Sequence, residues 1–83
     1  MTLQLEIYTP VQEYLKKEVD MVIVPGKMGE LGILPQHTPL LSLLNEGMVK
    51  IKTEGKWQEI KISEGYIEVG SNKVTILVDN VLT

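Results

Sequence analysis

Residues 60–78, IKISEGYIEVGSNKVTILV, contain three short runs in which apolar and polar side chains alternate. The turn signals Glu64-Gly65 and Gly70-Ser71-Asn72-Lys73 separate these runs. A period of two is typical of a strand with one buried face, and Gly or Asn tolerates the positive φ of a tight turn. The stretch therefore predicts consecutive strands joined by short connections.

The same pattern extends over most of the chain, with further alternating runs at residues 3–8 and 48–52. Residues 19–24 are apolar on nearly both faces, which predicts a more central strand. Residues 40–44 could form a helical turn, but the short length of this apolar segment favours a strand. The sequence thus predicts an all-β protein, a small two-sheet β-sandwich of short, mainly antiparallel strands.

Composition limits the function further. A length of 83 residues allows one domain, residues 1–83, and the formal net charge is −3. The sequence contains no Cys and no Arg, which argues against a disulfide framework, a Cys-type zinc site and nucleic-acid binding. It has neither an apolar run of about 20 residues nor the pattern of a signal peptide, so we expect a protein that is cytosolic or peripheral to a membrane.

Few residues in the sequence could take part in catalysis or bind a metal or cofactor. The single histidine, His37, has no sequence partners typical of a catalytic triad or a metal site. Gly26, Gly29 and Gly32 do not fit a phosphate loop or a dinucleotide loop, and we expect them to allow sharp bends and close backbone approach. Glu30 is expected in a loop. We predict no catalytic residue, cofactor or metal, although a small hydrolase or lyase would have to use Glu30 and His37 as its acid–base pair.

Residues 29–41, GELGILPQHTPLL, resemble the signature of the epsilon subunit of rotary F-type ATP synthases, whose mitochondrial counterpart is named delta. The shared pattern is G-E-L-G-I followed by H-x-P-L-L. Residues 46–51 and 63–79 also resemble the family, so the resemblance runs from about Leu3 to Asp79. Two positions depart from the pattern: Glu64 replaces a usual glycine, and Gln36 stands where glycine is common.

The resemblance implies the N-terminal β-sandwich domain of a non-catalytic rotor subunit in the central stalk. Such a subunit binds the gamma subunit and the polar loops of the c-ring, and so couples ion translocation to ATP synthesis or hydrolysis. The family pattern places the c-ring contact on Glu30 and the gamma interface on positions matching Thr9, His37 and Ser42. A β-sandwich module that binds proteins in an unrelated system is the alternative.

The resemblance also implies a location for the protein and a second domain in related chains. We expect a location peripheral to the membrane through the complex, at the cytoplasmic face of a bacterial plasma membrane rather than at an organellar membrane. Family members continue with two antiparallel helices, whereas this sequence ends at Thr83, so the helical hairpin is expected to be absent.

Overall fold

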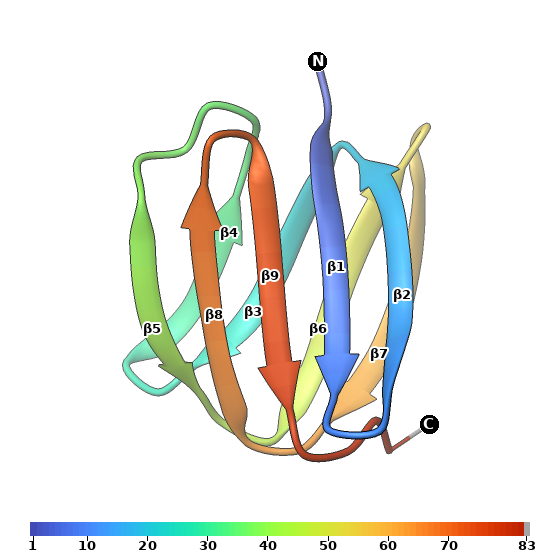
Figure 1. The fold of residues 1–83 in the computed structure, drawn as a ribbon. Coiled ribbons are helices and arrows are strands. Elements are labelled where there is room, and N and C mark those ends of the chain that lie inside the picture. The colour runs from blue at the N-terminus through green and yellow to red at the C-terminus, as the bar shows by residue number, and fades with distance from the viewer. Residues whose placement is uncertain (83) are drawn as a thin grey trace.

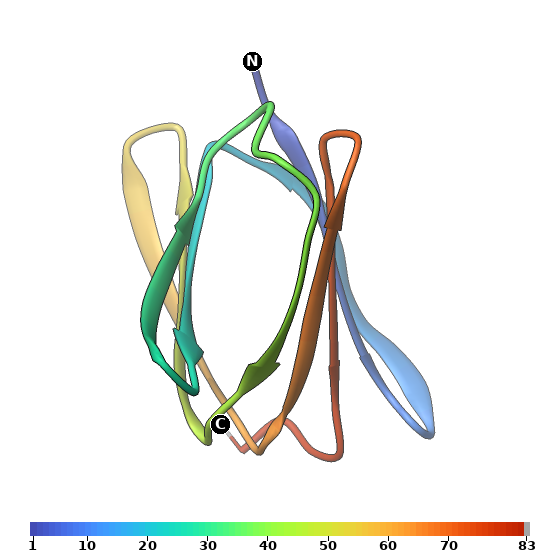
Figure 2. The ribbon, with the colours of Figure 1, turned by 90° about the vertical axis from the view of Figure 1, so that its left-hand side faces the viewer.

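The computed structural model describes residues 1–82, and over these residues it contains nine strands in two facing layers (Figures 1 and 2). The front layer of Figure 1 holds β2 (Gln12–Val19), β1 (Leu3–Thr9), β9 (Lys73–Val78), β8 (Gly65–Gly70) and β5 (Leu40–Leu44). The back layer holds β4 (Gly29–Ile33), β3 (Met21–Gly26), β6 (Gly47–Thr53) and β7 (Lys56–Ile62). Residues 1–82 include no helix that could cross a membrane. The predicted all-β sandwich is confirmed, including the strand over residues 40–44.

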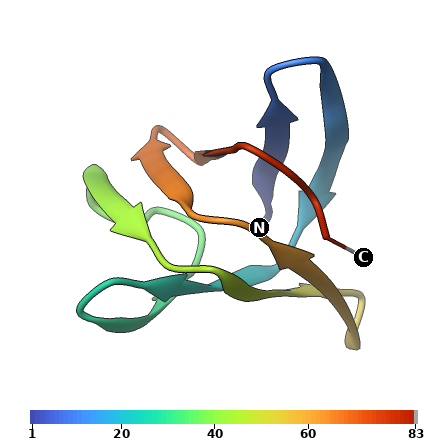
Figure 3. The same cartoon turned by 90° about the horizontal axis from the view of Figure 1, so that it is seen from below.

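Strand pairing is antiparallel except between β1 and β9, which run parallel in the middle of the front layer. Beyond β8, strand β5 forms the edge of this layer and meets β3 at the pair Leu44 and Gly26. The two layers are therefore joined along one side, where the sheet curls over, and Figure 3 shows this from below. The prediction of mainly antiparallel strands is confirmed.

The strand predicted over residues 19–24 is divided in the structure. Val19 ends β2 in the front layer, and Met21 begins β3 in the back layer. Between them Asp20 forms a bend, where its backbone N–H donates to the Lys52 carbonyl (2.7 Å) and its carboxylate accepts from the Glu54 N–H (2.8 Å). These bonds hold the corner at which the chain changes layer. The predicted central position applies to β3, which lies between β4 and β6.

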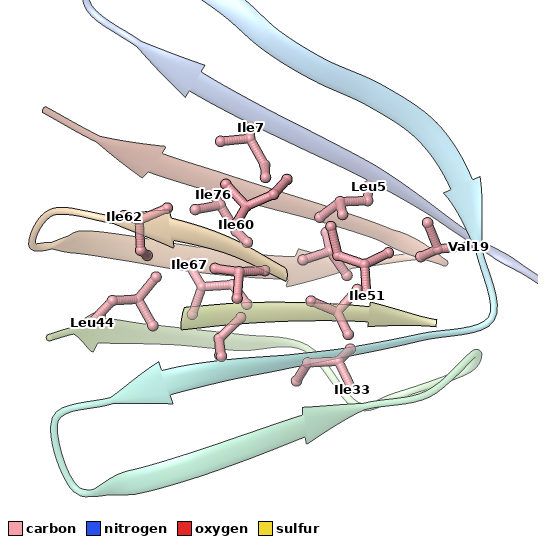
Figure 4. Close-up of a cluster of buried hydrophobic side chains, with 14 of the residues drawn as sticks. Leu5, Ile7, Val19, Ile33, Leu44, Ile51, Ile60, Ile62, Ile67 and Ile76 are labelled. Carbon is pink, nitrogen blue, oxygen red and sulfur yellow. The ribbon is translucent and has the colours of Figure 1, made fainter. Parts of the chain in front are cut away.

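The core fills the space between the layers, and Figure 4 shows its side chains meeting from both sides. Inward positions alternate along each strand, and most of them are apolar; Lys17, Ser42 and Gln58 are exceptions that lie opposite buried core residues. Complete burial of a Val, Leu or Ile side chain contributes about 1.5–3 kcal/mol to folding. The largest fully buried side chains are Leu3, Leu5, Ile7, Ile33, Leu44, Ile51, Ile62, Ile67, Ile76, Val19, Val22 and Val24.

The predicted close backbone approach is found at Gly26, where a Cβ would lie 2.6 Å from the Gly29 carbonyl oxygen, and the predicted sharp turning at Gly29. Gly65 adds a close approach that was not predicted. Gly29 follows the β3–β4 turn with φ of 124°, a conformation that side chains with a Cβ rarely adopt. Gly65 begins β8 so close to β9 that a Cβ on it would lie 2.0 Å from the Leu77 carbonyl oxygen. The contact at Gly65 depends on two strands packing together, so it is a property of the folded molecule.

Candidate functional site

Large apolar side chains form a row on the outer face of the front layer. In β5 and β8, Leu43 lies opposite Tyr66. Tyr66 lies opposite Leu77 of β9, which lies opposite Tyr8 of β1. Directly opposite residues project from the same face of a sheet, so these four side chains cross the layer as one line. We call them the outer row; Leu43 is 59% exposed and Tyr66 is 45% exposed.

Two shallow hollows adjoin this row and share Leu43 and Tyr66. The smaller, of about 310 Å³, is lined by Leu41, Ser42, Leu43 and Tyr66. The larger, of about 480 Å³, is lined by Tyr8, Thr9, Pro10, Lys27, Leu43, Leu44, Glu64, Gly65, Tyr66, Leu77, Val78 and Asp79. Leu41 is 71% exposed beside them. Exposed apolar surface bordered by polar groups is typical of a protein-binding site.

The structure brings Thr9 and Ser42 to this face. Thr9 ends β1 and lines the larger hollow, and its hydroxyl donates a long bond (3.4 Å) to the Gln12 carbonyl. Ser42 lines the smaller hollow, and its hydroxyl is 3.4 Å from the Leu43 carbonyl. Because strand alternation turns Leu41 and Leu43 outward, apolar side chains rather than the Ser42 hydroxyl dominate the exposed surface there.

His37 lies at the other end of the front layer, in the loop between β4 and β5 (Figure 1). Its Nδ1 is 2.7 Å from the Thr38 carbonyl oxygen, so Nδ1 carries a proton and donates. The preceding residue, Gln36, has φ of 66°, and its N–H donates to the Asn72 side chain (2.7 Å). This positive φ is the physical reason that glycine suits the position. Because His37 precedes β5 at one end of the front layer and Thr9 ends β1 at the other, the structure separates these two residues.

The expectation that Glu30 lies in a loop is wrong, because Glu30 is in β4, opposite Pro25 of β3. The turn is completed by Gly29, so Glu30 already pairs with β3 in the sheet. The exposed carboxylate is 3.7 Å from Lys50 Nζ on the outer face of the back layer. Such an exposed pair contributes about 0–1 kcal/mol.

The acid–base pair of Glu30 and His37 is not assembled. Glu30 is near the start of β4, and His37 follows the end of that strand. Neither residue lines either of the two hollows. Over residues 1–82, no three His, Asp or Glu side chains gather in an arrangement that could hold a metal ion.

A carboxylate is buried beside the outer row, although it belongs to the outward face of β1. Glu6 is 3% exposed and accepts from the Tyr8 hydroxyl (2.7 Å) and the Gln4 amide (2.8 Å). Lys73 Nζ is 3.6 Å away. The hydrogen bond from Tyr8, aided by the charges of Lys73 and Lys16, lowers the pKa of Glu6 below its ordinary value although burial opposes this. The same bond raises the pKa of Tyr8 to about 12.

Comparison with known proteins places this geometry in a family. A model of the "ATP synthase, Delta/Epsilon chain, beta-sandwich domain" matches residues 2–83. The chain belongs to this family. Among its relatives, the ATP synthase epsilon chain of Pelotomaculum thermopropionicum is 43% identical over 76 residues, covering 92% of this chain and 57% of the relative. That of Nitratidesulfovibrio vulgaris (strain Miyazaki F) is 48% identical over 79 residues, covering 95% and 59%. The chain thus spans less than two thirds of these relatives.

Chains in two solved ATP synthase structures share this fold. A chain in the Euglena gracilis mitochondrial ATP synthase structure of OSCP, F1 and c-ring matches with a TM-score of 0.92 at 23% identity, covering 98% of this chain and 52% of that one. A chain in the Tetrahymena thermophila mitochondrial ATP synthase structure of the central stalk and c-ring matches with a TM-score of 0.82 at 19% identity, covering 99% and 66%. At this identity the likeness supports the fold.

The outer row of this delta/epsilon sandwich was missed by the interpretation of the sequence. Its signal was present, because Tyr8, Tyr66 and Leu77 are apolar or aromatic residues at positions that alternation assigns to the outer face. Isolated exposed apolar residues are common, so one such residue does not by itself indicate a binding surface. Only the pairing of four strands places these side chains in one line.

Proposed function

We propose that this chain is the β-sandwich part of a central-stalk rotor subunit of an F-type ATP synthase. The observation that carries the proposal is the family match over residues 2–83. The subunit is non-catalytic and couples ion translocation to ATP synthesis or hydrolysis by joining the gamma subunit to the c-ring. It is peripheral to the membrane, held there by the complex, at the cytoplasmic face of a bacterial plasma membrane; the bacterial relatives named above support this location.

The gamma subunit binds the outer face of the front layer. The exposed outer row and its two hollows supply the apolar surface that such an interface requires. Thr9 and Ser42 border this surface, and His37 would make a separate contact at the far end of β5. Truncation of a well-buried contact at the centre of the interface would cost about 1–3 kcal/mol of binding.

The c-ring binds the end of the sandwich at which β3 turns into β4. Glu30 is exposed there. The neighbouring connections at the same end carry three acidic residues, Glu46, Glu64 and Asp79, and one basic residue, Lys27. Glu30 is paired with Lys50 at 3.7 Å, an exposed contact that a basic group of a ring loop could replace at little cost. Acidic side chains at this end favour basic and polar ring loops as the partner.

Association with the rotor tests the proposal. The protein is mixed with a gamma–c-ring preparation from the same source and followed by co-migration in size-exclusion chromatography at several ionic strengths. Co-migration is expected. A β-sandwich module of an unrelated system would elute alone at every ionic strength, and that result would refute the proposed function.

A matched pair of variants tests the role of Glu30. Glu30 is paired with Lys50, and Glu59 lies opposite the same lysine on the other side. We expect Glu30→Ala to weaken ring association and Glu59→Ala to leave it unchanged. Both should alter the free energy of unfolding by less than about 0.5 kcal/mol, because exposed side chains contribute little. Equal binding by the two variants, or a large fall in thermal stability for Glu30→Ala alone, would show that Glu30 has no special role in ring contact.

A further inference from the structure

The buried carboxylate of Glu6 is unusual because it lies on the outward face of its strand. Glu6 is opposite Lys16 of β2 and Thr75 of β9, and the side chains of Gln4 and Tyr8 flank it along β1. Its side chain is only 4% exposed, so these neighbours cover it. A buried charge needs hydrogen-bond partners, and here they are the Tyr8 hydroxyl, the Gln4 amide and the Lys73 ammonium group.

The bond to Glu6 determines which part of Tyr8 faces the larger hollow. Tyr8 lines that hollow, whereas Glu6 does not. The Tyr8 hydroxyl is committed to Glu6 Oε1 at 2.7 Å, toward the N-terminal side of β1, while the hollow extends toward Thr9 and Pro10. The ring therefore forms the wall of the hollow, and its polar group is directed away. Leu43 and Leu77 continue this apolar wall.

We infer that Glu6 is a positioning residue that holds the Tyr8 hydroxyl out of the larger hollow, so that the wall formed by Leu43, Tyr8 and Leu77 accepts an apolar side chain of the partner. This rests on the proposed function, since the partner is the gamma subunit bound at the outer row. A short hydrogen bond to a carboxylate is strong and directional, and a side chain held in its binding conformation loses less freedom when the partner docks. Without Glu6 the hydroxyl loses this bond and Glu13, opposite Tyr8 on β2, remains beside it, so an apolar partner side chain meets a polar group that Glu6 no longer holds away.

A double-mutant cycle separates this role from general support of the sheet. The variants are Glu6→Leu, Tyr8→Phe and the double variant, and their affinity for the gamma–c-ring preparation is compared with wild type. Glu6→Leu should weaken binding about three- to tenfold, the range expected when one hydrogen bond is lost. Tyr8→Phe should weaken it less, because the wall formed by Leu43, the ring of residue 8 and Leu77 stays apolar. The double variant should recover to the level of Tyr8→Phe.

Controls keep the cycle interpretable. Glu18→Leu makes the same substitution at an exposed carboxylate on β2 and should bind as wild type. If Glu6→Leu does not fold, as judged by circular dichroism, Glu6→Gln replaces it and should give a smaller loss that Tyr8→Phe again reverses. A double variant that binds as weakly as the Glu6 variant alone would overturn the inference, since it would show that Glu6 acts independently of the Tyr8 hydroxyl.

A second measurement needs no partner. The ring ¹³Cζ resonance of Tyr8 reports its ionisation, which should occur near pH 12 in the wild type and at lower pH in Glu6→Leu, where burial and the charge of Glu13 still raise the pKa but the largest cause is gone. An unchanged titration would show that Glu6 does not hold the hydroxyl. Failure of the wild type to bind the rotor would overturn the proposed function together with the binding role of Glu6. Binding by the wild type without recovery in the double variant would overturn the inference alone.

Discussion

Replacement of Gly65 by alanine should destabilise the protein severely. An added Cβ would lie 2.0 Å from the Leu77 carbonyl oxygen and 2.9 Å from the Val78 Cα, distances that require backbone movement in β9. Gly65 also pairs with Leu44 of β5, so β8 has little room to retreat. Forcing atoms into a packed interior costs about 1–3 kcal/mol and occasionally more, and contact with backbone places Gly65→Ala at about 3 kcal/mol.

This loss is large relative to the whole stability. At about 0.05–0.15 kcal/mol per residue, a domain of this length has a free energy of unfolding of about 4–12 kcal/mol. For a domain of 60–100 residues, each kcal/mol lowers Tm by about 4–8 °C, so a fall of about 12–24 °C is expected. Thermal unfolding followed by circular dichroism measures it.

Gly70 provides the matched control, because it lies at the other end of β8 and also pairs with β9. A Cβ on Gly70 would meet no atom within 4 Å. The free energy of unfolding of Gly70→Ala should therefore stay within about 1 kcal/mol of the wild-type value. Reduced conformational freedom of the unfolded chain adds a small stabilising contribution. The reasoning is refuted if Gly65→Ala unfolds within a degree or two of wild type, or if the two variants lose equal stability.

Two further predictions concern pH and the two faces of β5. The pKa of Glu6 is lowered in the folded state, so its contribution to stability is present above the ordinary pKa of 4.5 and is lost as pH falls through the folded pKa. In Glu6→Gln, the free energy of unfolding measured by urea titration should therefore fall less steeply as the pH is lowered. The raised pKa of Tyr8 has the opposite sign: its contribution is present below pH 10 and is lost between pH 10 and about 12, a loss that Tyr8→Phe should remove. In β5, Leu44→Ala should cost about 2–5 kcal/mol of unfolding free energy, and Leu41→Ala should cost less than about 0.5 kcal/mol. Equal losses in chemical denaturation would contradict the assigned faces.

Part of the candidate site could be predicted from sequence. The position of Thr9 at the end of the first strand and the strand over residues 40–44 that carries Ser42 follow from alternation and turn signals, and both are confirmed. Their functional roles came from resemblance to the family and stay predictions. The strand position of Glu30 was missed because nothing in the local sequence distinguishes a short turn followed by a strand from a longer loop.

The sequence by itself determined the strand class, most turn positions and the inward side of the strands that it predicted; β4 and most of β2 were not among them. Strand alternation is a local property, and burial on one face selects it directly. Only the tertiary structure decided that β1 and β9 pair in parallel, that the outer row crosses four strands, and that Glu6 is buried among its neighbours. These features depend on which distant strands lie side by side, because a side chain is covered or exposed by neighbours that the chain brings together only when both layers have packed.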